Sequence, residues 1–161
     1  MSTVAISHPA TAKAERVGTA SRLLEFYARL ALAGGFLSSV ADRFGLWGPP
    51  GSPRAAWGNW SNFVKYTAVL NFFVPRWMAP ALATAATVAE SSLALLLILG
   101  LWKRQVAALS AGLLCLFAVE MSVALGVKAP LDYSVFAASA AAVMLFVCAR
   151  KQAFEKGKNS V

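Results

Sequence analysis

Apolar residues dominate four stretches of the chain, and each is long enough to cross a membrane. The clearest stretch, Pro80 to Trp102, contains 23 residues. At a rise of about 1.5 Å per residue, a helix of this length spans about 34 Å, against a hydrocarbon core of about 30 Å. The pattern therefore predicts an all-α membrane protein, an antiparallel bundle of four transmembrane helices. The predicted helices cover residues 23–44, 80–102, 105–127 and 131–149.

Two tails and one long loop complete the predicted domain organisation around a membrane domain at 21–150. Residues 1–20 lack an apolar period and are expected to form a disordered cytoplasmic tail, and 151–161 a basic cytoplasmic tail. The loop 45–79 starts with a proline- and glycine-rich turn and continues from Ala56 with aromatic residues at helical spacing. This spacing predicts a short helix in the membrane interface, covering the outer side of the bundle. The predicted interfacial anchors are Trp57, Trp60 and Trp77.

One carboxylate, Glu90, lies at the centre of the second apolar stretch. A charged group near the bilayer midplane costs a few kcal/mol, so it is expected to face protein or water and to have a partner or a proton. Ala83, Thr87 and Ala94 share its helical face, which makes this the face that packs against other helices. We therefore predict that Glu90 is the functional centre, against the alternative of a buried ion pair that only sets helix register.

Other polar residues near the predicted spans are candidate members of the same polar core. They are Glu120, Asp132, Tyr133, Arg29 and the adjacent pair Asp42 and Arg43.

Two of these residues have alternative interpretations. Asp132 falls in the first turn of the predicted fourth helix, where an acid interacts favourably with free N–H groups. Arg29 lies four residues after Glu25, so the two form a helical pair at the inner interface or Arg29 reaches inward to Glu90.

The composition and the charge distribution support a membrane location. The chain is 58% hydrophobic and 14% charged, with a net charge of +8, and its basic residues sit at the ends of the apolar stretches. This placement disfavours nucleic-acid binding, which gathers basic residues on one surface. With the N-terminus inside, the inner segments hold nine basic residues and the outer ones five. Both termini are therefore expected to be cytoplasmic.

An autonomous enzyme is not expected from the residue types in the spans. The single histidine, His8, lies in the N-terminal tail, so no haem or metal site is evident. Cys115 and Cys148 fall at depths about 12 Å apart, which disfavours a disulfide. Any redox chemistry would need a partner protein or a bound quinone.

Three segments resemble the DoxX family of small four-helix bacterial membrane proteins, over nearly the whole span from Leu23 to Arg150. They are RLALAGGFLSSVADRFGLWG, TVAESSLALLLILGLWKR and KAPLDYSVF. The family's second-helix glutamate, glycine-leucine pair and basic turn match Glu90, Gly100-Leu101 and Lys103-Arg104. One departure is Ala41-Asp42-Arg43, where many relatives have a Gly-x-x-Lys-like exit from the first helix.

The resemblance implies a multi-pass protein of the bacterial inner membrane, associated with quinone-linked oxidoreductases. The expected function is an accessory or quinone-interacting component of a membrane redox system, with membrane or periplasmic redox proteins as partners. A bound quinone head would use Glu90, Glu120 and Tyr133 as hydrogen-bonding groups. A small-molecule or proton permeation path, or a structural partner without chemistry, are the alternatives, and a homo-oligomer stays open.

Overall fold

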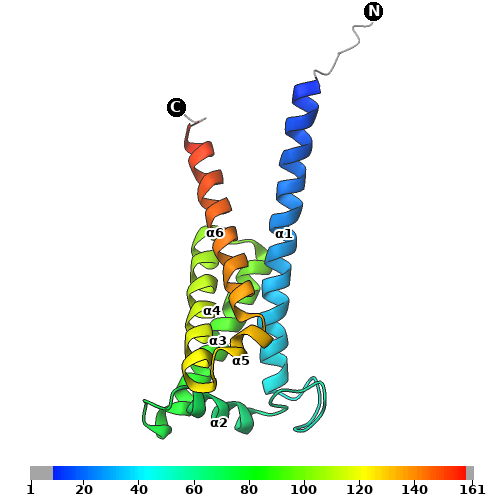
Figure 1. Ribbon diagram of the computed structural model, residues 1–161. Helices are drawn as coiled ribbons and strands as arrows, with labels where there is room; N and C mark the ends of the chain where they lie inside the picture. The colour runs from blue at the N-terminus through cyan, green and yellow to red at the C-terminus, as the bar shows by residue number, and fades with distance from the viewer. Residues whose placement is uncertain (1–8, 159–161) are drawn as a thin grey trace, which may run out of the picture.

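The computed structural model describes residues 9–158, and this part of the chain contains helices and turns without a strand. Four long helices alternate in direction, so that each is antiparallel to the next along the chain (Figure 1), and each includes a segment long and apolar enough to cross a membrane. The prediction of four transmembrane spans is confirmed at this level. The long helices are α1 (Pro9–Arg43), α3 (Ala79–Leu99), α4 (Lys103–Leu125) and α6 (Val135–Lys158). The short elements are α2 (Trp60–Leu70), the 3-10 turn η1 (Arg76–Met78) and α5 (Lys128–Asp132).

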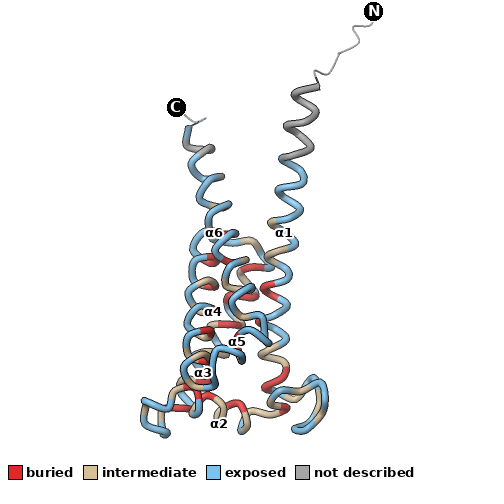
Figure 2. Tube along the Cα trace, in the orientation of Figure 1, coloured by how far each residue is buried: buried red, intermediate tan, exposed pale blue. Residues whose placement is uncertain are grey.

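The bundle is built from two close helix pairs. Helix α1 packs mainly against α3, and α4 packs mainly against α6. Both pairs contribute small and apolar side chains to one core between them. Many large apolar residues outside this core are exposed, as expected where the surrounding solvent is lipid. Figure 2 shows exposed residues along all four long helices. The buried core consists of Leu32, Ala33, Phe36, Leu93, Ala94, Leu97, Val106, Ala107, Leu114, Ala142 and Leu145.

The first helix starts much earlier than the apolar pattern predicts. It begins at Pro9, so the expectation of a disordered tail is wrong for residues 9–20. Proline is well tolerated at the start of a helix, and the alanine-rich sequence that follows has high helix propensity. Once the apolar part is helical, each further turn forms without a new nucleation cost. Residues 1–8 lie outside the described residues.

Glycines end the two central helices earlier than predicted. Gly100 has a φ of 69° and donates its N–H to the Leu96 carbonyl at 2.9 Å, a left-handed C-terminal cap. Helix α3 therefore ends at Leu99 and not at residue 102, and α4 begins at Lys103. Helix α4 ends before Gly126, two residues short of the predicted end.

The predicted fourth helix is two helices in the structure. The helix is interrupted after α5 at Ser134, where φ is 55°, and α6 starts at Val135. Asp132 is the last residue of α5, so the prediction that it lies in the first turn of the membrane helix is wrong. Helix α6 then continues to Lys158, so the backbone is helical over most of the predicted tail at 151–161.

Helix α2 lies across the end of the bundle where α1 ends and α3 begins (Figure 1). It contacts α1, α3 and α4, so the loop covers this end of the bundle as predicted. The helix starts at Trp60, four residues later than expected. The Asn59 side chain sets this start, since its Oδ1 accepts the N–H of Asn62 at 2.8 Å.

Candidate functional site

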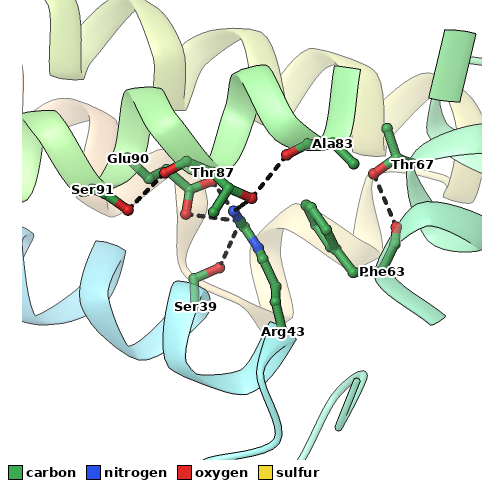
Figure 3. Close-up of polar contacts among 8 residues, drawn as sticks. All are labelled: Ser39, Arg43, Phe63, Thr67, Ala83, Thr87, Glu90 and Ser91. Atoms are coloured by element: carbon green, nitrogen blue, oxygen red, sulfur yellow. Dashed lines mark hydrogen bonds and ion pairs between the residues drawn. The ribbon is translucent and has the colours of Figure 1, made fainter. Parts of the chain in front are cut away.

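A buried ion pair between Glu90 of α3 and Arg43 of α1 is the centre of the candidate site (Figure 3). Arg43 Nη2 donates to both carboxylate oxygens of Glu90, at 2.6 Å to Oε1 and 2.8 Å to Oε2. Glu90 is 1% exposed and Arg43 is 2% exposed, so both charges are removed from solvent and lipid. The predicted partnered acid at the centre of this span is therefore present, and its partner comes from the end of α1.

Two hydroxyl groups accept further hydrogen bonds from the guanidinium, whereas its buried Nε has no hydrogen-bond partner among the described residues. Arg43 Nη1 donates to Thr87 Oγ1 at 2.7 Å, and Nη2 donates to Ser39 Oγ at 3.2 Å. Thr87 precedes Glu90 by three residues on α3, and Ser39 precedes Arg43 by four on α1, so each pair shares one helix face. The Thr87 hydroxyl donates onward to the Ala83 carbonyl at 2.8 Å, which orients its oxygen as an acceptor.

Aromatic rings from the loop cover Arg43. The guanidinium carbon lies 3.9 Å from the ring centroid of Phe63 and 5.6 Å from that of Trp57. The two rings contact each other edge to face, with centroids 4.9 Å apart. A cation above an aromatic face is attracted by the ring quadrupole, more strongly where water is excluded. The loop helix therefore stabilises the ion pair as well as covering it.

Asp42, next to Arg43, holds the aromatic cover in place. Its Oδ2 accepts the backbone N–H of Ala56 at 2.9 Å and of Trp57 at 2.8 Å. Asp42 is buried, and hydrogen bonds to a charged acceptor are stronger than neutral ones. The end of α1 thus carries two adjacent charges with different roles, one toward the loop and one toward α3.

Arg29 does not reach Glu90, so its predicted role as an inward counter-charge is wrong. Its Nε and Nη2 donate to the Leu97 carbonyl at 2.8 and 2.6 Å, and Nη2 also donates to the Ile98 carbonyl at 3.1 Å. The last carbonyls of a helix lack intrahelical partners and carry its negative dipole end, so a cation is favourable there. In the alternative Glu25–Arg29 pair, Arg29 acts on Glu25 through its charge and not through a direct ion pair: the two carboxylate oxygens of Glu25 accept from Lys103 at 2.8 Å and from Gln152 at 2.9 Å.

The remaining predicted polar residues lie apart from the ion pair. Asp132 pairs with Lys128 on the surface, and Tyr133 is exposed. Glu120 is half-buried on α4, beside Tyr66 of the loop helix. Burial raises the pKa of Tyr66, and the nearby Tyr133 and Glu120 raise it further. Among the described side chains, no hydrogen bond or ion pair joins these residues to Glu90.

The predicted tryptophan anchors differ in their surroundings. Trp57 packs in the cover over Arg43, and Trp60 stacks on Phe44 with ring centroids 6.1 Å apart. Both are therefore parts of the folded cap. Trp77 is 79% exposed, which leaves its whole ring for the bilayer interface.

The sequence analysis did not identify the residues that accept hydrogen bonds from the two terminal nitrogens of the guanidinium or the ring that covers it. Thr87 was placed on the face of Glu90 without a role, and Ser39 and Phe63 were not assigned to the site. The signal for the hydroxyl groups was their spacing of three and four residues from the two charges. The contact of Phe63 with Arg43 joins positions 20 residues apart and has no local signal.

The ion pair is enclosed by the side chains around it. A cavity of about 10 Å³, room for one water, lies at the other end of the bundle. It is lined by Glu25, Arg29, Gly100 and Lys103 among others. Among the side chains that the structure describes, at 18–154 and 158, no three potential metal-ligating groups lie together.

Four apolar helices around an enclosed ionic core define a multi-pass helical membrane protein. No protein-family model, no curated protein and no solved structure matches the chain. The resemblance to the DoxX family therefore stays a prediction from residues and motifs.

Proposed function

We propose that the protein is a DoxX-like integral-membrane accessory component of a membrane redox system, acting through partners. The observation that carries the accessory role is the Arg43–Glu90 pair, which is fully enclosed and capped by Phe63. An acid held this way has its charge matched and its oxygens occupied. Through Arg43, this acid attaches the loop at 45–79, which we call the loop cap, to the membrane helices. The redox assignment comes from the resemblance of the motifs.

Direct quinone binding inside the chain has less support than the accessory role. Ligand pockets occupy about 300 Å³ or more, whereas the cavity described above measures about 10 Å³. Glu90, Glu120 and Tyr133, the groups expected to bind a quinone head, do not converge on one space. A quinone is better accommodated at a surface that the protein shares with its partner.

A proton relay also has less support. A relay needs carboxylates linked through hydrogen bonds or water, and Glu90 is bound by Arg43 while Glu120 faces the loop helix. No hydrogen-bonded chain connects the two acids within residues 9–158. We therefore keep the accessory role as the proposed function.

The loop cap is the surface that we assign to partner contact. It displays large aromatic side chains that the bundle does not bury. Asp42 and the ion pair hold this surface in one arrangement relative to the membrane helices. A rigid surface loses less entropy on association than a mobile loop. The exposed aromatic residues that we assign to this surface are Trp47, Phe72 and Phe73.

The test compares quinone-dependent oxidoreductase activity in membranes from the parent strain, a deletion strain and complemented strains. We expect the deletion to lower the activity and the unaltered chain to restore it. A Phe72→Ser/Phe73→Ser variant should fold and insert but fail to restore activity, whereas Leu109→Ser, an exposed apolar site on α4 away from the cap, should restore it. Unchanged activity in the deletion strain would refute the redox role. Stoichiometric quinone binding by the purified chain would refute the accessory role.

We further propose the bacterial inner membrane and a cytoplasmic location of both termini, from the distribution of basic residues. Single cysteines at Ser52 and Ser160, in a background without Cys115 and Cys148, test the orientation. An impermeant thiol reagent applied to intact cells should label the cysteine at position 52 and not the one at 160. The reverse pattern would invert the proposed topology.

A further inference from the structure

Among the described side chains, six exposed cations surround the end of the bundle opposite the loop cap. We call them the basic collar: Arg22, Lys103, Arg104, Arg150, Lys151 and Lys158. They come from three helices, α1, α4 and α6, which are joined at this end of the bundle, while the N-terminal part of α1 and the C-terminal part of α6 extend beyond it (Figure 1). Their side chains are free of the ionic core described above.

The collar rests on a fixed junction of the three helices. Glu25 of α1 accepts a hydrogen bond from Lys103 of α4 at 2.8 Å and from Gln152 of α6 at 2.9 Å. Arg22 lies one turn from Glu25, and the other collar residues adjoin Lys103 or Gln152 along their helices, with Lys158 further out on α6. Five of the six cations are therefore held near one level, and Lys158 lies about 9 Å further along α6.

Acidic residues leave most of this positive charge uncompensated. Residues 18–29, 100–106 and 148–158 hold eight basic and two acidic residues. The opposite end, residues 42–78 and 120–135, holds five basic and three acidic residues, and Arg43 there is neutralised by Glu90. The positive potential is thus concentrated at the collar end.

The collar directly borders an apolar surface. Leu23, Leu24 and Tyr27 of α1 and Trp102 before α4 are all exposed within one or two turns of collar residues. The Arg104 guanidinium also lies 5.8 Å from the ring centroid of Phe146 on α6. A ligand that fits this arrangement has an anionic head beside an apolar chain.

We propose that the basic collar binds the phosphate headgroups of anionic phospholipids, with their acyl chains along the adjoining apolar surface. Basic residues that gather between transmembrane helix ends attract anionic headgroups, and the attraction weakens with salt. A free phosphate would complement the positive charge of the collar but would leave the adjoining apolar surface without a contact. The proposal does not depend on the redox role, since it concerns lipid and the opposite end of the molecule.

The test measures lipid retention on the purified full-length protein by native mass spectrometry, with phosphatidylglycerol and phosphatidylcholine as probes. We expect preferential retention of phosphatidylglycerol that falls as salt rises. An Arg104→Gln/Arg150→Gln/Lys151→Gln variant should lose it, by about fivefold per cation and on the order of 100-fold in all. The matched control removes three cations at the cap end, Arg54→Gln/Lys65→Gln/Arg76→Gln, and should keep the preference.

Several outcomes would overturn the proposal. An equal loss of phosphatidylglycerol retention in the two triple variants would show that only the net charge of the protein matters. Equal retention of phosphatidylglycerol and phosphatidylcholine by the unaltered protein would show that it has no headgroup preference. Thermal stabilisation by inorganic phosphate equal to that by phosphatidylglycerol would assign the collar to a soluble anion. If the triple collar variant does not fold, Arg104→Gln and Arg104→Lys replace it, and only the charge-retaining lysine should preserve the preference.

Discussion

Replacing Glu90 by glutamine should destabilise the protein because it leaves the buried Arg43 without a counter-charge. Both oxygens of Glu90 accept from Arg43, at 2.6 and 2.8 Å, and the guanidinium is 2% exposed. Removing one partner of a buried ion pair costs about 3–5 kcal/mol. Thr87, Ser39 and the aromatic cover remain, so we expect the lower end, about 3 kcal/mol.

The assay is the free energy of unfolding in mixed micelles, followed by tryptophan fluorescence during a denaturing-detergent titration. Glu120→Gln is the control, since Glu120 is half-buried and has no ion-pair partner among the described side chains. The control should change the free energy of unfolding by less than about 1 kcal/mol. A loss below about 1 kcal/mol for Glu90→Gln as well would refute the reasoning.

A double-mutant cycle separates the ion pair from a chemical role of the acid. Arg43→Gln and Glu90→Gln should each destabilise, and the double variant should lose at least about 2 kcal/mol less than their sum. Additive losses would contradict the pairing. If redox activity in cells follows stability and returns in the double variant, Glu90 acts through structure; a stable but inactive double variant would indicate a chemical role for the carboxylate.

Three further predictions concern the loop and the helix ends. Asp42→Asn should cost about 2 kcal/mol and speed hydrogen exchange at the two loop amides that it accepts, whereas the exposed Asp132→Asn should leave exchange there unchanged. Gly100→Ala should destabilise the protein by about 1 kcal/mol or more, because φ is +69° and the new Cβ would lie 2.5 Å from an Arg29 nitrogen. In the control Gly34→Ala, the new Cβ meets nothing within 4 Å, so this variant should be neutral or stabilised. Equal effects of the two substitutions in a thermal melt would count against this account. The pKa of Tyr66 is raised, so the folded state keeps the phenol proton at a pH where the unfolded state has lost it. The contribution of neutral Tyr66 to stability is therefore full below about pH 10 and is lost as the pH rises above it. Tyr66→Phe should flatten the alkaline decline in the melting temperature, and an unchanged decline would contradict the assignment.

Local sequence patterns determined the elements of this protein well. Four apolar runs of sufficient length predicted four spans, because a helix in lipid must satisfy its backbone internally and expose apolar side chains. Gly100 is a recognisable helix C-terminus and Asn59 a recognisable helix N-cap, although the predicted boundaries, residue 102 and Ala56, use neither. The position of α1's start was missed because helix propagation outside the membrane depends on propensity and not on apolar periodicity.

The identity of Glu90 as the buried acid was also available from its position in the chain, since a carboxylate at the centre of an apolar span must be enclosed. The partner of Glu90 could not be identified from the sequence in the same way. Arg29 and Arg43 are 14 residues apart on α1, so at about 100° per residue they project within about 40° of each other. Helix periodicity places both on nearly the same face and cannot choose between them.

The choice was made by the register of α1 against α3, which only the tertiary structure decides. With the helices antiparallel, Arg29 meets the last carbonyls of α3 and Arg43 meets Glu90. The cover over Arg43 depends equally on where the loop helix docks, because Phe63 reaches the guanidinium through space and not along the chain. Spacing within a helix determines which residues share a face. Which faces meet is determined by the register and docking of one helix against another, and this register depends on packing across the whole bundle.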